Sequence, residues 1–364
     1  MRFQSLQKTL IVMLGIGFIP CSSLLAQQAG EKQTTSVSPA NDPDLQTRRH
    51  VTIATLGPQP LAADSKAEPQ QIVERMIGHW RKELGQVLTD KPDLIVLPEC
   101  CDRPSGLSED KVREYYRVRG DQIQNALAEI AGKNHCYVVY SANKLQADSS
   151  WRNACVLLDR QGRVVGEYHK NHPTIGEIED NIRPGREAKI FECDFGRVAF
   201  AICFDLNFDE LRLQYARLRP DLIIFCSMYH GGMMQPYWAY SCRSHFVGAV
   251  SGLPCEIYNP LGEKIGHSTN YFDFAVTTVN LDCRLAHLDY NWDRLRRMKE
   301  KYGPAVIVTD PGFLGSVLIS SRHPALTADQ IVKEFEIELL DDYLNRARVR
   351  QKQEPLPKEE GDKP

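Results

Sequence analysis

The stretch "RVAFAICFDLNFDELRLQYARLRPDLIIFCS" (197–227) decides the fold, because it places a helical segment between two strand-like runs. RVAFAIC (197–203) and DLIIFCS (221–227) are short, apolar and rich in β-formers, and residues 207–218 have helical spacing. A strand, a helix and a strand in this order are typical of an α/β domain. Cys203 ends the first run, and acidic residues follow it at once.

The same alternation extends toward the N-terminus. The expected strands are VTIATL (51–56), DLIVLPE (93–99), CYVVYSA (136–142) and ACVLLD (154–159), and the expected helices cover about 69–88 and 110–132. Turn signals inside 157–168 and 256–267 predict hairpins, so the sheet is expected to be mixed. No GxGxxG or GxxxxGK[ST] string occurs, which disfavours a dinucleotide-binding design.

The composition bounds the class of protein. The chain has 364 residues, 42% of them hydrophobic and 25% charged, which is ordinary for a globular protein. The formal net charge is −3, and no basic run lies beside aromatic residues. We therefore expect no nucleic-acid partner.

The N-terminal residues 1–26 have the order of a secretory signal peptide. Basic residues Arg2 and Lys8 precede an apolar stretch over 10–19, and small residues lead to Ala26. The apolar stretch is shorter than the about 20 residues that a membrane span needs, and no later stretch qualifies. The mature chain is expected to be exported, periplasmic or secreted, with no membrane span; a retained anchor is the alternative.

Composition also divides the rest of the chain. Residues 27–50 are polar and predict a flexible linker, and residues 351–364 predict a disordered tail. The length allows one large domain or two smaller ones, and we take residues 51–325 as the main α/β domain. Residues 326–350 have apolar positions at helical spacing after Thr327, which predicts one long amphipathic helix. That helix packs either on its own domain or on a partner subunit.

Eleven cysteines include Cys21 in the signal, which leaves ten in the mature chain. No CxxC pair occurs, so a zinc site is disfavoured and no metal is expected. Cys136, Cys155 and Cys226 lie within apolar runs, where a buried thiol is the simpler interpretation. Disulfide pairing stays open.

Three reactive side chains stand at the ends of predicted strands. Glu99 follows DLIVLP, Lys170 lies in GEYHKNHPT (166–174), and Cys203 closes RVAFAIC. Taken singly, Glu99 suits a cap or a solvated position, Lys170 a surface position, and Cys203 an inert buried thiol. Together they supply the base, the positive charge and the nucleophile that acyl transfer from an amide or nitrile requires.

With these residues in view, the sequence resembles the nitrilase (carbon–nitrogen hydrolase) superfamily. The strings LIVLPE, YHKNHPT and AICFDLNFDE match its Glu, Lys and Cys motifs in chain order, and Glu177 in KNHPTIGE matches its second glutamate. The match covers about 51–283. The resemblance implies a four-layer αββα sandwich with mixed sheets, no cofactor, and a homo-oligomer.

The resemblance also implies a reaction. Cys203 attacks the acyl carbon, Glu99 acts as the base, Lys170 stabilises the anion, and Glu177 holds Lys170 or the substrate, giving a thioester that water hydrolyses. Phe204 and Asp205 after the cysteine favour small amide or N-carbamoyl substrates, whereas nitrile-cleaving relatives typically have Trp-Glu there. Nitrile hydrolysis, and an inactive binding or assembly module of the same fold, are the alternatives.

The chain departs from the family pattern in four places. Asn207 and Asp209 stand where members often have Arg and Pro, and Ser244 and His245 stand where relatives carry Glu-Asn. The segment MYHGGMMQPYWAY (228–240) gathers aromatic and methionine side chains that suit an acyl pocket, the core or an interface.

Overall fold

A computed structural model describes residues 50–354. The predicted signal (1–26), nearly all of the predicted linker (27–50) and residues 355–364 lie outside the described residues. Among residues 50–354, no helix is long and apolar enough to cross a membrane.

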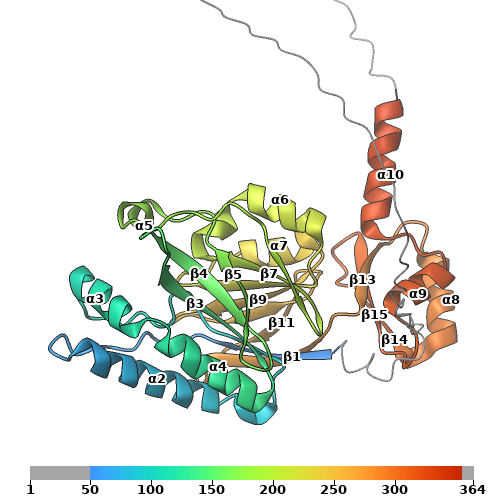
Figure 1. Ribbon diagram of the computed structural model, residues 1–364. Helices are drawn as coiled ribbons and strands as arrows, with labels where there is room; N and C mark the ends of the chain where they lie inside the picture. The colour runs from blue at the N-terminus through green and yellow to red at the C-terminus, as the bar shows by residue number, and fades with distance from the viewer. Residues whose placement is uncertain (1–49, 355–364) are drawn as a thin grey trace, which may run out of the picture. The chain divides into compact units, whose positions relative to one another are not determined.

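Two six-stranded sheets form the centre of the fold (Figure 1). The first sheet has the strand order β12-β1-β2-β3-β4-β5, and the second has the order β11-β10-β9-β8-β7-β6. The strands of the first sheet are β1 (His50–Leu56), β2 (Leu94–Val96), β3 (Tyr137–Leu145), β4 (Trp151–Leu158), β5 (Val164–His169) and β12 (Phe274–Asn280). Those of the second are β6 (Ile190–Cys193), β7 (Gly196–Ile202), β8 (Leu222–Ser227), β9 (His245–Val250), β10 (Glu256–Tyr258) and β11 (Lys264–His267).

Both sheets are mixed, as the hairpin signals predicted. Strands β1, β2 and β3 pair in parallel, as do β7, β8 and β9, and the outer pairs are antiparallel. The predicted hairpins are confirmed as β4–β5 and β10–β11. The helices are α2 (Pro69–Gly85), α3 (Glu109–Arg119), α4 (Gln122–Asn134), α5 (Ile175–Glu179), α6 (Asp209–Leu218), α7 (Met234–Cys242), α8 (Trp292–Tyr302), α9 (Ala328–Glu334) and α10 (Leu340–Gln353). The 3₁₀ turns are η2 (Leu88–Asp90), η3 (Cys203–Asn207) and η4 (Gly303–Ala305).

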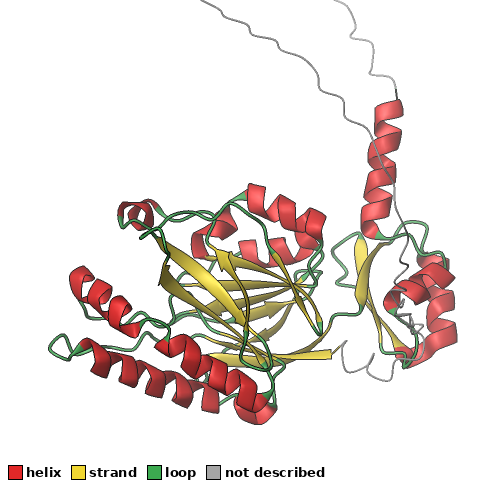
Figure 2. Ribbon diagram, viewed as in Figure 1, coloured by secondary structure: helices red, strands yellow, loops and turns green. Residues whose placement is uncertain are grey.

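The period-2 alternation of the strands creates the layers. In β1, Val51 and Ile53 belong to the core between the two sheets, whereas Ala54 and Leu56 belong to the core under α2, α3 and α4. Figure 1 shows α2 and α4 along one side of the paired sheets and α6 and α7 along the other, and Figure 2 shows the same helices in red. The predicted four-layer αββα sandwich is confirmed.

The single helix predicted for 110–132 is wrong. The chain forms α3 and α4 instead, and Gly120 stands between them with φ +46°. A residue with a Cβ rarely adopts that conformation, so glycine ends α3 and lets the chain turn into α4.

The single helix predicted for 326–350 is also wrong. Thr327 caps the start as expected, with its hydroxyl accepting from the Gln330 amide, but α9 ends at Glu334 and α10 begins at Leu340. Glu336 has φ +51°, and Leu339 makes a β-bridge to Ala286. The apolar side chains around the break pack into a separate small core, which outweighs helical continuity.

Residues 283–353 build that small core. Strands β13 (Cys283–His287), β14 (Val306–Thr309) and β15 (Ser316–Ser321) form a third, antiparallel sheet with α8 and α9 packed on it. The predicted domain 51–325 therefore contains a sheet that does not join the sandwich. Helix α10 extends to Gln353, so it includes the first three residues (351–353) of the predicted disordered tail.

Candidate active site

The Glu99 carboxylate lies between the two sheets, three residues after β2, and is only 4% exposed. Its Oε1 accepts from Asn153 Nδ2 at 2.7 Å, and its Oε2 accepts from the Met228 backbone N–H at 3.0 Å. Asn153 is on β4 of the first sheet, and Met228 follows β8 of the second. Glu99 is therefore neither a helix cap nor a solvated carboxylate, and both sheets hold it.

Lys170 follows β5 and is among the most deeply buried side chains, at 1% exposure. Its Nζ donates to Glu99 Oε1 at 2.9 Å and to Glu177 Oε2 at 2.8 Å. Burial by itself lowers the pKa of Lys170, but the adjacent Glu99 and Glu177 carboxylates more than offset it, so the net pKa is raised. The structure thus excludes a surface role and gives the site a permanent cation.

Glu177 completes this charged cluster from α5. Its position is set by a capping box: the Glu177 N–H donates to Thr174 Oγ1 at 3.3 Å, and the Thr174 N–H donates to Glu177 Oε2 at 2.8 Å. Burial raises the pKa of Glu177, but the Lys170 charge and the hydrogen bonds from Lys170 and Asn153 outweigh burial and lower it. Glu177 therefore stays ionised beside Lys170.

Asn153 is a site residue that the sequence analysis missed. Its Nδ2 donates to Glu99 Oε1 at 2.7 Å and to Glu177 Oε1 at 2.9 Å, so one amide group links the two carboxylates. Its Oδ1 accepts from Ser141 Oγ at 3.3 Å. The only sequence signal is a polar residue at the start of the apolar run 154–159, and its meaning depends on the strand register.

Cys203 follows β7 directly and begins η3, with φ +46°. Such a conformation is uncommon for a non-glycine residue, and strained residues of this kind concentrate at functional sites. Burial, and then the Glu99 charge, raise the pKa of the Cys203 thiol to about 12, while Lys170 opposes that rise. The resting thiol is therefore protonated and depends on a base to react.

Asp205, two residues after Cys203, ties the cysteine turn to the lysine loop. This fully buried carboxylate accepts from the Ile202 N–H at 3.0 Å, the Tyr168 hydroxyl at 2.7 Å and the His172 N–H at 2.7 Å. The first donor precedes Cys203, and the other two flank Lys170 in sequence. Asp205 thus fixes the relative position of the nucleophile candidate and the cation.

A cavity of about 220 Å³ opens onto the cluster. Glu99, Lys170, Glu177 and Cys203 all line it, so the structure brings the four predicted site residues together. The remaining lining residues are Cys100, Arg103, Glu109, Val112, Arg113, Tyr116, Asn143, Trp151, Thr174, Asp180, Ile182 and Met228. Most of these flank the cavity from α3 and from the chain around α5.

The aromatic segment 228–240 contributes little to this cavity. Met228 alone lines it, and Trp238 is buried in the core with its Nε1–H donating to Leu206 O at 3.1 Å. Met233 and Tyr237 are exposed. The segment is therefore mainly core and surface, not the acyl pocket.

The four departures from the family pattern have local explanations. Asn207 Nδ2 donates to Phe204 O at 3.1 Å within η3, and Asp209 accepts from Arg212 Nε at 2.9 Å in α6. Ser244 Oγ donates to Pro220 O at 2.6 Å, and burial lowers the pKa of His245 to about 4. None of the four lines the cavity.

The sequence from 52 to 250, more than half of the chain, matches the family described as carbon-nitrogen hydrolase. The chain belongs to the carbon-nitrogen hydrolase family. It is similar to nitrilase homolog 2 of Dictyostelium discoideum (24% identity over 229 residues, 58% of this chain and 66% of the relative). It is also similar to omega-amidase NIT2 of Danio rerio (24% over 196 residues, 51% and 66%).

These alignments span slightly less than two thirds of either curated relative. Among solved structures, the C. elegans NitFhit protein superposes with a TM-score of 0.55 at 18% identity, covering 70% of this chain and 65% of that one. This likeness shows that the carbon-nitrogen hydrolase chain shares the nitrilase fold.

Proposed function

We propose that the protein hydrolyses the carbon–nitrogen bond of a small amide or N-carbamoyl amine through a thioester on Cys203. The supporting observation is the Lys170 ammonium, 2.9 Å from Glu99 and 2.8 Å from Glu177, in the same cavity as Cys203. The similarity to an omega-amidase supports an amide substrate. No step of this reaction calls for a metal or an organic cofactor.

In the first half-reaction the Cys203 thiol passes its proton to Glu99 as the sulfur attacks the acyl carbon. A free thiolate is disfavoured here, because the thiol has a pKa of about 12, so proton transfer accompanies attack. The tetrahedral anion is stabilised by Lys170 and by the backbone N–H after Cys203. Glu99 returns the proton to the leaving nitrogen, and ammonia or an amine departs from the thioester.

In the second half-reaction Glu99 takes a proton from water, and the hydroxide attacks the thioester. The carboxylic acid leaves as Cys203 recovers its proton. Glu177 and Asn153 hold Lys170 and Glu99 in place throughout, through the contacts at 2.8 and 2.7 Å. Because these groups are already positioned, the site loses little free energy to reorganisation during the reaction.

The cavity favours small substrates. Its volume of about 220 Å³ is below the about 300–1,000 Å³ typical of pockets for drug-sized ligands. Tyr116 and Trp151, whose ring centroids are 5.5 Å apart, and Val112 and Ile182 give it apolar walls. A short acyl group fits such a space.

The test compares a short aliphatic amide, the N-carbamoyl amine of matched size and the matched nitrile on one preparation, following ammonia and acid together. We expect the amide or the N-carbamoyl compound to be turned over faster than the nitrile. Turnover of the nitrile alone would favour the nitrilase alternative, and no turnover of any of the three would favour a binding module.

We also propose that the chain is exported and forms a homo-oligomer. The order of basic, apolar and small residues over 1–26 supports export. N-terminal sequencing of the protein from its native source is expected to begin near Gln27, and an intact Met1 on protein from the cytoplasm would contradict export. Sedimentation of the purified chain tests the oligomer.

A further inference from the structure

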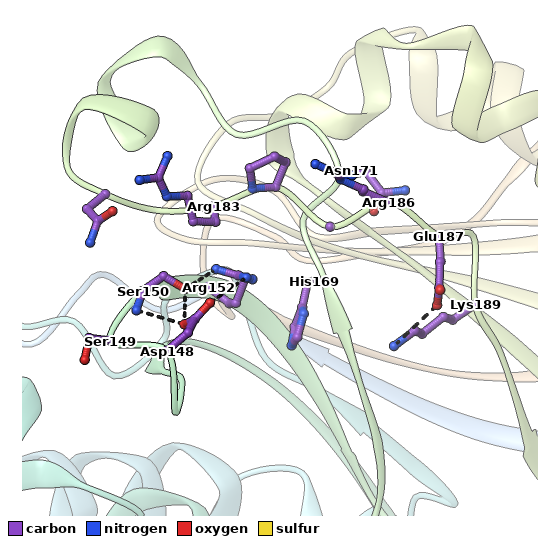
Figure 3. Close-up of a pocket in the computed structure, with 13 residues that line it drawn as sticks. Asp148, Ser149, Ser150, Arg152, His169, Asn171, Arg183, Arg186, Glu187 and Lys189 are labelled. Carbon is purple, nitrogen blue, oxygen red and sulfur yellow. Dashed lines mark hydrogen bonds and ion pairs between the residues drawn. The ribbon is translucent and has the colours of Figure 1, made fainter. Parts of the chain in front are cut away.

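A second, larger hollow of about 1010 Å³ lies beside the catalytic cavity (Figure 3). None of the four predicted catalytic residues lines it. Apart from Pro184 and Gly185, every lining residue is polar or charged. We call this hollow the basic groove, after the basic residues that line it: Arg152, His169, Arg183, Arg186 and Lys189.

Two carboxylates line the groove but neutralise its cations only weakly. The Asp148 side chain, 64% exposed, is 3.8 Å from Arg152, and the Glu187 side chain, 73% exposed, is 3.9 Å from Lys189. Exposed ion pairs contribute about 0–1 kcal/mol. A bound anion can therefore compete with both carboxylates for these cations.

Arg183 and Arg186 are the uncompensated charges. Across residues 50–354, the side chain of neither arginine has a hydrogen bond or an ion pair, and both are exposed on the loop that borders the groove. A guanidinium presents a planar fork of donors that matches phosphate and carboxylate oxygens. Arg183 and Arg186 lie three residues apart on the loop, and Arg152 lies on the strand across the groove (Figure 3). Three arginines around one concave space give it a positive potential.

A carboxylate near the floor of the groove is already neutralised. Glu167 accepts from Lys144 Nζ at 2.5 Å and lies 3.5 Å from His169 Nε2. The His169 contact, followed by Lys144, outweighs burial and lowers the pKa of Glu167 to about 2. Glu167 therefore pairs with Lys144 and His169 and leaves the charges of Arg183 and Arg186 uncancelled.

The groove and the catalytic cavity share their walls. Trp151 lines the cavity and its neighbour Arg152 lines the groove, and the same holds for Ile182 and Arg183. Successive side chains of a strand point to opposite faces, which explains the first pair. The backbones are joined as well, because the Arg183 N–H donates to Trp151 O at 2.9 Å.

The loop 181–187, which carries Arg183 and Arg186, also contacts the segment that contains Lys170. The Gly185 N–H donates to Lys170 O at 2.8 Å. A Cβ at Gly185 would lie 2.3 Å from His169 O, so only glycine permits this approach. A ligand that immobilises the loop 181–187 therefore also restrains the backbone of Lys170.

We propose that the basic groove binds a small multivalent anion, with a phosphate group as the best match, through Arg183, Arg186 and Arg152, and that binding holds the loop 181–187 against the Lys170 segment. The observations favour a small ligand over a nucleic acid, because no Phe, Tyr or Trp lines the groove for base stacking and the whole chain has a net charge of −3.

The test is calorimetric titration of the full chain with inorganic phosphate at constant ionic strength, with succinate as a second arm. We expect saturable phosphate binding at least ten times tighter than succinate binding. The double variant Arg183→Gln/Arg186→Gln should weaken phosphate binding at least tenfold. The matched control Arg297→Gln/Arg322→Gln removes two other exposed arginines and should bind as the unmodified chain does.

Hydrogen exchange supplies a readout that does not depend on hydrolysis. Phosphate should slow exchange of the Gly185 amide, which donates to Lys170 O, in the unmodified chain but not in the double variant. The proposal is overturned if phosphate binding is not saturable, if both double variants bind alike, or if succinate binds as tightly. A changed oligomeric state in Arg183→Gln/Arg186→Gln, with phosphate binding intact, would instead make the groove a subunit interface.

Discussion

At the scale of single residues, the role of Cys203 rests on its sulfur and on its strained turn. Cys203→Ala removes the proposed nucleophile while a small residue replaces a small residue at φ +46°, so we expect a folded protein with no measurable hydrolysis. Ammonia release measures the hydrolysis, and a circular dichroism spectrum measures whether the variant is folded. Cys193→Ala, at a half-buried thiol outside the cavity, is the control and should keep its activity. More than a few per cent of activity in Cys203→Ala would contradict the assignment of Cys203 as the nucleophile.

Asn153 is the second residue whose substitution should have a measurable effect on catalysis. Asn153→Ala removes one hydrogen bond to Glu99 and one to Glu177, so that Lys170 alone still links the two carboxylates. A hydrogen bond to a charged group contributes about 1.5–3 kcal/mol, so the loss of the one bond to the proposed base Glu99 should lower kcat/KM by about 10–150-fold.

The measurement is kcat/KM on the best amide of the substrate comparison, with Asn125→Ala on the exposed face of α4 as the control. Equal kcat/KM in Asn153→Ala and the control would show that Lys170 alone organises the two carboxylates. A parallel loss of folding stability and of kcat/KM would mark Asn153 as structural.

The sequence predicts the residues whose chemistry is rare at a strand end. Glu99, Lys170 and Cys203 were identified in this way, and the structure places all three on one cavity. Asn153 escaped because an asparagine is unremarkable in sequence, and its role arises from the register that places it beside Glu99. Chemical type can be read from sequence, whereas a hydrogen-bond partner from a distant strand cannot.

At the scale of elements, strands were predicted well and helix ends poorly. The apolar runs around 51–56, 136–142 and 221–227 correspond to β1, β3 and β8, because a buried strand has to be apolar along most of its length. The helices at 110–132 and 326–350 each break in two. Both breaks occur at a residue with positive φ, Gly120 or Glu336, whose conformation depends on what the following segment packs against.

The break at Gly120 predicts a pair of opposite stability changes. Gly120→Ala adds a Cβ at φ +46° and ψ −124°, a backbone conformation that alanine disfavours, and we expect it to lower the free energy of unfolding by about 1–3 kcal/mol. Gly78→Ala, at an exposed position inside α2, should raise it by up to about 1 kcal/mol.

Apart from the adjoining residues and the helix's own backbone, no heavy atom lies within 4 Å of a Cβ built at either glycine, so backbone conformation is the variable that separates the two variants. Urea unfolding of both variants beside the unmodified chain measures the difference. If Gly120→Ala raised the free energy of unfolding as Gly78→Ala does, α3 and α4 would be able to adjust and form one continuous helix.

At the scale of the whole molecule, the site requires both sheets. Glu99 and Lys170 follow strands of the first sheet, whereas Cys203 and Met228 follow strands of the second. The contacts between Glu99 and Met228 N, and between Asp205 and the Tyr168 hydroxyl, cross the interface between the sheets. The sequence predicts strands but not which sheet each one joins, so this arrangement, like the third sheet of residues 283–353, lay beyond sequence reasoning.

Because the protein buries several thiols and phenols, we expect its free energy of unfolding to fall at alkaline pH. Burial raises the pKa of Cys136 to about 11 and of Cys242 and Cys283 to about 12, and it raises the pKa of Tyr168 and Tyr215 far above the usual range. In the unfolded chain, a thiol has a pKa of about 8.5 and a phenol of about 10.

Between the unfolded and folded pKa values, the unfolded chain binds fewer protons than the folded one. The free energy of unfolding therefore falls as pH rises, by about 1.4 kcal/mol per pH unit for each such group. Each buried thiol stabilises the fold fully below its unfolded pKa of about 8.5. This stabilisation is lost as the pH rises from that value toward the pKa of the folded protein. We expect stability to be level near pH 7–8 and to fall steeply from pH 9 to 10.

Guanidinium unfolding at pH 7, 8, 9 and 10 in the presence of a reductant measures this decline. Cys242→Ala removes one buried thiol from α7, where alanine is a good helix former, and should reduce the slope between pH 9 and 10 by about 1.4 kcal/mol per pH unit. Stability that stays level from pH 8 to 10, or a Cys242→Ala slope equal to that of the unmodified chain, would mean that these thiols reach solvent in the folded protein. The same burial would leave these thiols unreactive toward oxidants.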